Sequence, residues 1–569
     1  MVKKSRMDWK INENNDSEIV SNLAKELNVD SVIALMLVNR GICSYEQAKD
    51  FFRPNLSKLH DPFLMKDMDL AVNRILKSID RQESIMIFGD YDVDGICSVA
   101  LLSTYLKKIG AKVSSYIPDR NKEGYGISNN AINLANQRNQ TLIIALDCGI
   151  KANKQVDYAL EKGIDFIICD HHLPDKSIPK ALAVLNPKRL DCEYPFKDLC
   201  GCGLGFKLIQ AINFKRGSNI DKIVNYLDLV TLAIAADIVP VVGENRILAH
   251  FGLHVINFNP RVGIYRILKN NKKKEFGFED LLFYVAPRIN ASGRIKHASL
   301  SLELLVEEDQ EKAEKLFKEI DVLNTQRREI EKKITQEALD QIKESNSESK
   351  NSTIVYKDSW NKGVIGIVAS RLIEKHYKPT VVFCKSKDGN LTASARSIKG
   401  IDLYNLLCEC KESILNFGGH KYAAGLMIEE KKYIEFKESF EKAISRNLEN
   451  HLPNQEILIE SKIELKSITP KFYRILKQFE PFGPGNKTPI FLTKELYLDG
   501  ILSKVGKEKE HIKFSVVQNK KHSFPSIGFW MSDKSNKILS QNSFSMAYSI
   551  DQNNWNGKKS IQLKIRDIK

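Results

Sequence analysis

The sequence predicts a doubly wound, mostly parallel α/β sheet, joined by a long helix to a second α/β domain and followed by an all-β module. Three observations predict it. Short apolar runs alternate with helical spacing from Ile85 onwards, a highly charged helical stretch covers about 303–345, and short strands dominate after about 455. A chain of 569 residues is too long for one core, so several domains are expected.

The first α/β region contains five short β candidates, and helical stretches separate most of them. We expect five segments in all: a helical lead-in (1–60), the first α/β domain (61–300), a connecting helix and linker (301–350), a second α/β domain (351–450) and the all-β module (451–569). The β candidates of the first domain are Ile85–Phe88, Val113–Ile117, Leu142–Leu146, Phe166–Cys169 and Ala183–Leu185.

Three carboxylates, Asp90, Asp92 and Asp94, follow the first of these strands at alternate positions, and a helical pattern begins just after them. They therefore lie at the carboxyl end of a strand, where open α/β sheets place ligands. Carboxylates this close repel one another, which favours a cation between them, and hard oxygen ligands suit Mg²⁺ or Mn²⁺. The simpler alternative is a solvated acidic turn.

Further metal-ligating residue types follow later strands. Asp147 comes directly after Leu142–Leu146, Asp170-His171-His172 follows Phe166–Cys169, and Asp237 lies in an apolar stretch. Taken singly, Asp147 is explained as a helix cap and the histidine pair as a surface feature, whereas a buried Asp237 needs a partner. Because parallel strands deliver their carboxyl ends to one edge, these groups are expected to converge. So many carboxylates with one or two imidazoles favour a two-metal centre.

The charge distribution indicates a polyanionic partner. The net charge is +15, and residues 501–569 hold 13 Lys+Arg against 5 Asp+Glu, so about half of the excess lies in the last module. Lysines there are interspersed with Phe, Tyr and Trp, a composition typical of OB-folds that bind single strands, although aromatic residues of a small β-barrel often belong to its core. The second α/β domain adds Ser394, Arg396, two glycines and His420, which suit phosphate recognition, although a glycine pair is also common in simple turns.

Several other classes are excluded or disfavoured. The ten cysteines have neither disulfide-framework nor zinc-site spacing, so a reducing cytoplasm is expected. Gly201, Gly203 and Gly205 lack the strand and spacing of a dinucleotide loop, and close helix packing is the simpler explanation. The N-terminus shows no secretory signal, and the longest apolar run, Tyr226–Val242, contains two acids and is short for a membrane span.

The ordered motifs Asp92-Val93-Asp94, Asp147, Asp170-His171-His172 and Asp237 resemble those of the DHH phosphoesterase superfamily, and further stretches resemble its RecJ-type exonucleases. The resemblance runs through nearly the whole chain and no metal-ligand position is missing. The further stretches are Gly89–Gly95, Ile117–Arg120, Glu123–Gly126, Ala286–Arg294, Ser394–Ser397, Gly418–His420 and Pro481–Asn486.

This resemblance implies a DHH domain, a DHH-associated domain and an OB-fold, with two Mn²⁺ or Mg²⁺ ions. The implied activity is 5′→3′ hydrolysis of single-stranded DNA to mononucleotides in repair and recombination. The implied setting is a cytoplasmic monomer that works with single-strand-binding protein and a helicase. Two alternatives remain: a phosphodiesterase for nanoRNA or cyclic dinucleotides, and a non-enzymatic replication or repair scaffold. The basic β module speaks against the first, and the intact acids speak against the second.

The resemblance also assigns residues. The implied metal ligands are Asp90, Asp92, Asp94, Asp147, His171 and Asp237, with Asp147 as the bridge and Asp90 as a residue that orients the others. Asp94, Asp147 and His172 are the implied catalytic residues, and His172 contacts a phosphate oxygen or the leaving group. Arg120, Ser394, Arg396 and His420 are expected to hold the 5′-phosphate, and Arg288 and Asn290 to line the substrate path.

Overall fold

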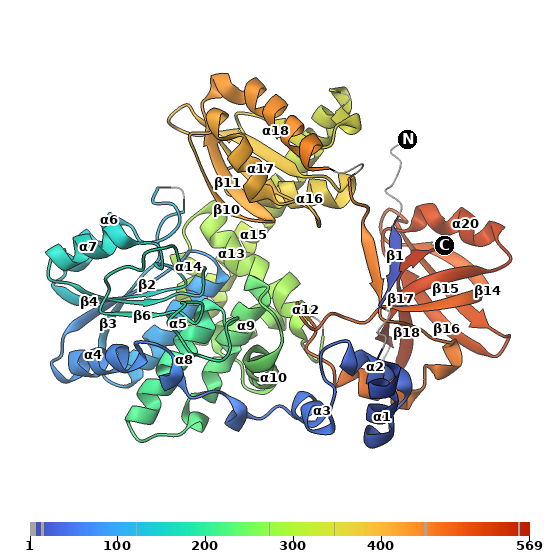
Figure 1. Cartoon of the computed structure of the whole chain (residues 1–569), viewed down its shortest axis with the longest axis horizontal. Coiled ribbons are helices and arrows are strands. Elements are labelled where there is room, and N and C mark those ends of the chain that lie inside the picture. Colours follow the sequence, from blue (N-terminus) through green and yellow to red (C-terminus); the bar gives the residue numbers. More distant parts are fainter. Residues whose placement is uncertain are drawn as a thin grey trace. The chain divides into compact units, whose positions relative to one another are not determined.

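The computed structural model describes residues 7–12, 16–120, 122–271, 273–345, 347–448, 452–555 and 558–569. The chain divides into two compact units. The first contains Leu56–Pro453, and the second contains Arg6–Asn55 together with Asn454–Lys569 (Figure 1). No helix in the described ranges is both long enough and apolar enough to cross a membrane.

The first unit is built on a five-stranded, fully parallel sheet, as the sequence predicts. The strand order is β3-β2-β4-β5-β6. After β2 the chain crosses to β3 on one side and then returns to β4 on the other, so the strand order reverses between β2 and β4. Ligands bind at such a point in open α/β sheets. The strands are β2 (Ser84–Gly89), β3 (Lys112–Tyr116), β4 (Gln140–Leu146), β5 (Asp165–Cys169) and β6 (Ala183–Leu185).

Helices cover both faces of this sheet because the strands are apolar on both faces. Ile85 and Ile87 of β2 point into one buried cluster, with α4, α5 and α8. Met86 and Phe88 point into another, with α6 and α7. The sheet therefore forms the middle layer of a sandwich. The helices are α4 (Met68–Asp80), α5 (Val93–Lys108), α6 (Asn129–Gln137), α7 (Asn153–Glu161) and α8 (Gly201–Lys215).

A helical layer follows the sheet and leads into one long connecting helix, α15 (Gln310–Glu344). Its apolar side is buried along its length, including Phe317, Ile320, Ile334 and Ala338. The preceding helices are α9 (Leu227–Asp237), α10 (Gly243–Phe258), α11 (Val262–Lys269), α12 (Phe278–Asp280), a π-helix (Leu281–Val285), α13 (Ala286–Ile295) and α14 (Ser299–Val306).

The rest of the first unit is a smaller α/β domain with a mixed sheet of order β10-β11-β9-β8-β7, in which only the β7–β8 pair is parallel. Helix α16 packs on β8 and β9. The elements are β7 (Thr353–Tyr356), α16 (Ile365–His376), β8 (Thr380–Lys385), β9 (Leu391–Arg396), α17 (Leu403–Glu409), β10 (Asn416–His420), β11 (Ala423–Ile428) and α18 (Tyr433–Asn447).

The second unit contains an OB-like closed barrel, because β14 pairs with β15 and also with β17, the last strand of the sheet. Helix α19 (Pro470–Lys477) lies between β13 and β14, and α20 (Ser535–Ser540) lies between β16 and β17. The strands are β13 (Ser461–Lys462), β14 (Phe491–Val505), β15 (His511–Gln518), β16 (His522–Gly528), β17 (Phe544–Trp555) and β18 (Lys558–Ile568).

The helical lead-in expected over 1–60 shares its core with this barrel. Leu23, Ile33 and Leu37 belong to the same buried cluster as Phe479 and Phe491. Strand β12 (Glu456–Ile459) pairs with β1 (Asp8–Ile11) in a separate two-stranded parallel sheet. Residues far apart in the sequence thus form one hydrophobic core. The lead-in helices are α1 (Ser17–Leu27), α2 (Ser31–Val38) and α3 (Tyr45–Phe52).

Candidate metal centre

The turn between β2 and α5 positions the first group of carboxylates. Asp92 is the N-cap of α5, and its Oδ1 accepts hydrogen bonds from the backbone N–H groups of Asp94 (3.0 Å) and Gly95 (3.2 Å). A Cβ atom at Gly95 would lie 2.4 Å from the carbonyl oxygen of Asp90, so the tight turn requires glycine there. Asp90 and Asp94 are both buried. The turn therefore directs acids into the interior.

The N-terminus of α8 holds the Asp94 carboxylate. The N–H of Gly201 donates to Asp94 Oδ2 (2.6 Å), and the N–H of Cys202 donates to Oδ1 (2.7 Å). A Cβ atom at Gly201 would lie 2.6 Å from the Cβ of Asp147. The sequence suggests only close packing for this glycine; in the structure its backbone also binds one acid while its missing side chain leaves room for another.

We expect Gly201→Ala to lower metal affinity and activity by about 10- to 100-fold, the effect typical of disturbing groups that orient metal ligands. The added methyl must displace Asp147 or the end of α8, because backbone and Cβ atoms cannot share that space. Mn²⁺ titration of the thermal unfolding midpoint would measure the change. Gly203→Ala is the control, since its added Cβ would meet only side-chain atoms at 3.4 Å or more. Equal metal affinity in the two variants would contradict the prediction.

Asp147, His171 and Asp237 complete the centre. Asp147 follows β4 with a left-handed backbone (φ 60°), which is uncommon for a residue other than glycine. His171 Nε2 lies 3.2 Å from Asp147 Oδ1, 3.6 Å from Asp237 Oδ2 and 3.9 Å from Asp94 Oδ2. Asp237 comes from the last residue of helix α9, not from the edge of the sheet. Ligand atoms of Asp94, His171 and Asp237 lie within 4.8 Å of one another.

Electrostatics favour a cation here. Burial, with repulsion from Asp92, raises the pKa of Asp94 to about 7, and burial with repulsion from Asp94 raises that of Asp237 to about 9. Burial and nearby carboxylates also hold the pKa values of Asp90 and Asp147 well above the usual range. Burial lowers the pKa of His171 to about 3, so its imidazole is neutral and available as a ligand.

Buried polar atoms without hydrogen-bond partners also indicate a cation site. Asp90 Oδ1, Asp237 Oδ2 and both ring nitrogens of His171 are buried without a hydrogen-bond partner among the described residues. Buried polar atoms normally find partners, and carboxylate oxygens with a neutral imidazole are a suitable set for Mn²⁺ or Mg²⁺. The residues present therefore fit divalent cations.

Asp170 supports His172 and does not join the repelling carboxylates. Its Oδ1 lies 2.7 Å from His172 Nδ1, and its Oδ2 accepts the N–H of Ile150 (2.9 Å). Burial opposes ionisation of Asp170, but the hydrogen bond and charge of His172 outweigh it and lower the pKa; the same pair raises the pKa of His172. The hydroxyl of Tyr125 lies 3.3 Å from His172 Nδ1. Asp170 and Tyr125 belong to two separate sequence motifs, and neither motif indicates these contacts.

A group of arginines lies beside the carboxylates. Burial and the nearby guanidinium groups of Arg120, Arg327 and Arg396 lower the pKa of Arg294 to about 9, and burial with Arg120 lowers that of Arg396. Arg120 also stacks on Tyr91, 4.8 Å from the ring centroid. Like charges gathered in this way favour an anion between them. Sequence reasoning included Arg294 in a motif but gave it no role.

Ser394 and Arg396 are two residues apart on β9, and Arg396 Nη1 donates to Ser394 Oγ (3.1 Å). A Cβ atom at Gly366, in the first turn of α16, would lie 2.9 Å from Ser394 Oγ and 3.3 Å from Arg396 Nη2. The helix N-terminus therefore approaches the serine and the arginine closely. These three features together suit a phosphate group.

The other predicted substrate residues differ in their surroundings. Arg288 donates to Asp321 Oδ1 and to the carbonyl of Tyr284 (both 2.9 Å) and stacks on the Tyr284 ring. Asn290 is partly buried on α13. His420 ends β10, and burial with the charges of His172, Lys151 and Lys188 lowers its pKa. The charge of His172 thus reaches His420, whereas Arg288 is engaged with α15.

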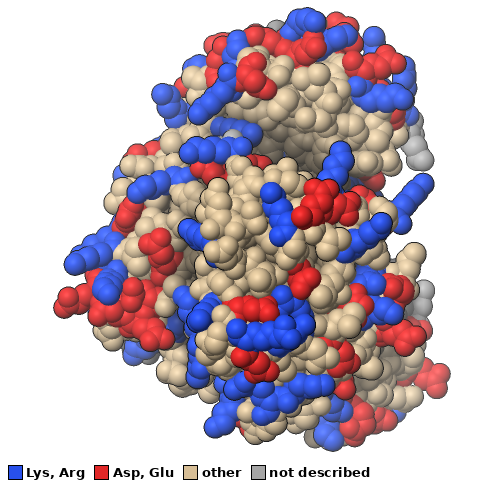
Figure 2. Space-filling model, turned by 90° about the vertical axis from the view of Figure 1, so that its left-hand side faces the viewer, with Lys and Arg blue, Asp and Glu red and all other residues tan. Residues whose placement is uncertain are grey.

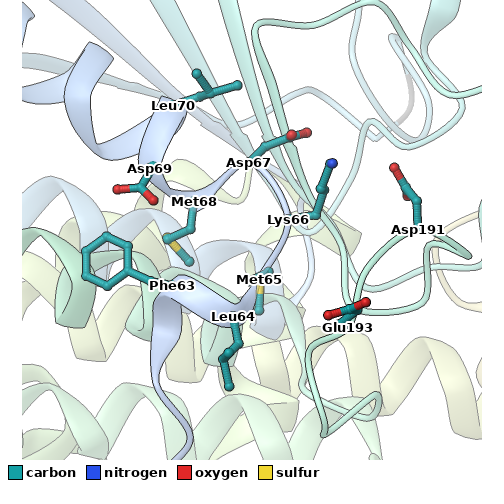
Figure 3. Close-up of a pocket in the computed structure, with 10 residues that line it drawn as sticks. All are labelled: Phe63, Leu64, Met65, Lys66, Asp67, Met68, Asp69, Leu70, Asp191 and Glu193. Atoms are coloured by element: carbon teal, nitrogen blue, oxygen red, sulfur yellow. The ribbon is translucent and has the colours of Figure 1, made fainter.

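Neither the charge on one face of the molecule nor a cavity elsewhere in the first unit marks this centre. On the face drawn in Figure 2, basic and acidic side chains are interspersed, so no patch of one sign marks a binding surface there. A cavity of about 430 Å³ is lined by Phe63–Leu70, Asp191 and Glu193, and it contains none of the carboxylates described above (Figure 3). Its acids are in part paired, since Arg189 binds both Asp67 and Asp191.

Comparisons with known proteins agree with this architecture. Residues 84–234 match the N-terminal domain of the DHH family, residues 350–446 match the DHHA1 domain, and residues 459–567 match the RecJ OB domain. These three domains define a DHH-type protein that carries an OB module.

Individual relatives identify one family within this class of proteins. The chain is 35% identical to the single-stranded-DNA-specific exonuclease RecJ of Bacillus subtilis over 99% of this chain and 71% of that protein. It is 30% identical to the Escherichia coli protein of the same name over 89% and 90% of the two chains. A crystal structure of RecJ with Mn²⁺ from Thermus thermophilus matches with a TM-score of 0.85 and 26% identity, over 99% of this chain and 80% of that one. The chain belongs to the RecJ family.

Proposed function

We propose that this protein is a metal-dependent exonuclease that hydrolyses single-stranded DNA from the 5′ end and releases mononucleotides. The observation that carries the proposal is the arginine group beside a buried cluster of carboxylates and a neutral imidazole. A phosphodiesterase that acts at a phosphorylated chain end can use one site for the scissile phosphate and another for the terminal phosphate. RecJ relatives named as single-stranded-DNA-specific exonucleases support the substrate class.

The residues that would hold two Mn²⁺ or Mg²⁺ ions are Asp92, Asp94, Asp147, His171 and Asp237, with Asp147 as the bridge and Asp90 orienting them. Such ions supply an activated water and neutralise charge on the scissile phosphate. Helix α8 fixes Asp94 through its first backbone N–H groups. His172, held by Asp170 through Nδ1, keeps a proton available for a phosphate oxygen or for the leaving oxygen.

The arginine group determines where cleavage occurs. Arg120, Arg294, Ser394 and Arg396 bind the 5′-phosphate, and His420 assists from the end of β10. The distance from this pocket to the carboxylates would then measure one nucleotide. Asn290 and Arg288 line the route of the following nucleotides. The 5′ polarity rests on the family resemblance and on this pocket.

We expect Arg396→Ala to reduce the preference for a 5′-phosphate over a 5′-hydroxyl by about 10- to 100-fold, as hydrogen bonds to charged groups are worth about 1.5–3 kcal/mol. The measurement is kcat/KM on two oligonucleotides that differ only at the 5′ end. Arg446→Ala, at an exposed position on α18, should leave the preference unchanged. An equal loss on both substrates in Arg396→Ala would argue against a terminal-phosphate pocket.

The whole proposal is tested by incubating the protein and Mn²⁺ with labelled single-stranded DNA, duplex DNA and a cyclic dinucleotide. Release of mononucleotides from the single strand, starting at the 5′ end, is expected. Faster turnover of the cyclic dinucleotide would favour a small-substrate phosphodiesterase. Absence of hydrolysis on all three would favour a non-enzymatic scaffold.

The wider setting is part of the same proposal. We place the protein in DNA repair and recombination in the cytoplasm, where it would act as a monomer. Single-strand-binding protein and a helicase are its proposed partners, since a nuclease for single strands needs a process that exposes them. Analytical ultracentrifugation with and without single-strand-binding protein would test whether the protein is a monomer and whether it binds that partner.

A further inference from the structure

One turn of the second α/β domain contacts an arginine of the first. The turn covers residues 361–363 and leads directly into α16. The guanidinium of Arg294, in the last turn of α13, donates through Nη1 to the carbonyl oxygen of Gly363 (2.9 Å). A member of the arginine group is therefore held by a backbone atom that lies 69 positions further along the chain.

The close approach at Gly363 leaves no room for a side chain. A Cβ atom there would lie 2.5 Å from the carbonyl oxygen of Arg294 and 3.1 Å from Asn361 Oδ1. The first of these is a backbone atom of α13, which cannot turn aside as the end of a flexible side chain can. Gly363 is buried, so the contact is closed to solvent. One glycine therefore packs against the backbone of Arg294 and also accepts a hydrogen bond from its guanidinium.

Hydrogen bonds fix the 361–363 turn. The N–H of Gly363 donates to Asn361 Oδ1 (2.8 Å), and the N–H of Val364 donates to the carbonyl of Asn361 (3.0 Å). The indole N–H of Trp360, just before the turn, donates to Glu337 Oε2 of α15 (2.8 Å). Trp360 and Val364 also belong to a buried cluster that α15 and α16 share. Local hydrogen bonds therefore set the shape of the turn, and α15 sets its position.

The same segment continues to the other members of the proposed phosphate pocket. Helix α16 begins two residues after Gly363, and its first turn closely approaches Ser394 and Arg396 of β9. Further along α16, the guanidinium of Arg371 donates through Nε to Glu331 of α15 (2.9 Å), which fixes the helix in place. One short stretch of chain therefore contacts phosphate-binding candidates from both α/β domains of the first unit.

We propose that Gly363, supported by Asn361, is a positioning residue that holds the Arg294 guanidinium in the 5′-phosphate pocket and thereby strengthens the preference for 5′-phosphorylated strands. An arginine side chain that is already held in place loses less conformational freedom when it binds an anion. The carbonyl of Gly363 occupies one N–H of the guanidinium and leaves the others for a phosphate. This inference rests on the proposed function, since the pocket is part of that proposal.

The first test compares kcat and KM with Mn²⁺ on two oligonucleotides that differ only in a 5′-phosphate or a 5′-hydroxyl. Gly363→Ala should raise KM for the phosphorylated strand by about tenfold with little change in kcat, because the added methyl pushes the turn away from Arg294. Both constants for the hydroxyl strand should be unchanged, whereas general damage to the fold would alter them. Asn361→Ala should have the same effect in weaker form, about threefold.

A double-mutant cycle tests whether Gly363 acts through Arg294. If it does, adding Gly363→Ala to Arg294→Ala should cause no further loss of the 5′-phosphate preference, and additive losses would overturn the proposal. Two control variants should keep the preference: Gly277→Ala, whose added Cβ has no atom within 4 Å, and Asn270→Ala, at an exposed position at the end of α11. Circular dichroism would show whether each variant is folded, and Asn361→Ala carries the test if Gly363→Ala unfolds.

A binding measurement in EDTA separates this inference from the proposed nuclease function. The affinities of the full-length protein for the same two oligonucleotides, with a dye at the 3′ end, are followed by anisotropy. A 5′-phosphate preference that Gly363→Ala reduces, in a protein that cleaves nothing, would support the positioning role and overturn the nuclease proposal. An unchanged preference in both Gly363→Ala and Asn361→Ala would overturn the positioning role even if the protein is a nuclease. Equal binding of both strands by the unmodified protein would overturn the pocket and this inference together.

Discussion

Asp147→Ala is expected to reduce Mn²⁺-dependent nuclease activity by on the order of a thousandfold or more while leaving the protein folded. When several residues act as one catalytic unit, the loss of one of them removes most of the contribution of the whole unit. Asp147 lies 3.2 Å from His171 and carries a pKa well above its usual range because burial and the charges of Asp94, Asp92 and Asp237 oppose its ionisation. The substitution would remove a proposed metal ligand and also part of the repulsion between the carboxylates.

The reduced repulsion between carboxylates gives a second, more specific prediction. Without metal, Asp147→Asn should unfold at a higher urea concentration than the unmodified protein, because one fewer carboxylate must be buried. With Mn²⁺ the order should reverse, since the unmodified protein gains more from binding. Asp157→Ala, at an exposed position on α7, is the control for both measurements. Retained turnover in Asp147→Ala would remove Asp147 from the metal site.

The metal-free protein is expected to lose stability as the pH rises from about 4 towards about 9. A carboxyl whose pKa is higher in the folded state than in the unfolded state binds a proton preferentially in the folded state. Its stabilising contribution is therefore present at low pH and is lost as the pH rises to the folded-state pKa. Asp94, with a pKa of about 7, and Asp237, with a pKa of about 9, are such groups.

Each such carboxyl contributes a slope of about 1.4 kcal/mol per pH unit between its two pKa values. Urea unfolding in EDTA at a series of pH values measures this slope. Saturating Mn²⁺ should flatten or reverse it, because the ions displace the protons, and calorimetry in buffers of different ionisation enthalpy should detect their release. A metal-free stability that does not decrease between pH 5 and pH 8 would contradict the electrostatic account of the site.

The sequence by itself determines the layout of the first sheet. The apolar run Ile85–Phe88 becomes β2 (Ser84–Gly89), and Leu142–Leu146 becomes β4 with only its start extended. Local patterning suffices because these strands are buried on both faces and their helices alternate with them regularly. The doubly wound sheet, the connecting helix and the OB module are confirmed. The position of acids just after strand ends also predicts that they gather at one edge.

Roles that depend on contacts between distant residues could not be predicted in this way. The amides of Gly201 and Cys202 bind Asp94 from more than a hundred positions away in the chain. Asp170 belongs to the named triplet, yet its contact with His172 makes it a support for the histidine. Arg294 and Arg288 come from one motif, but only Arg294 joins the arginine group, since Arg288 is paired with Asp321.

The residue types and their order along the chain thus determined the fold class, the kind of chemistry and the set of candidate ligands. Only the tertiary structure decided which backbone groups fix those ligands, which arginine joins the arginine group and which aromatic rings remain exposed. The physical reason is that burial, hydrogen bonding and charge repulsion depend on distances between side chains. Those distances are set when helices such as α8 and α13 pack beside the sheet, and periodicity within one segment does not encode them.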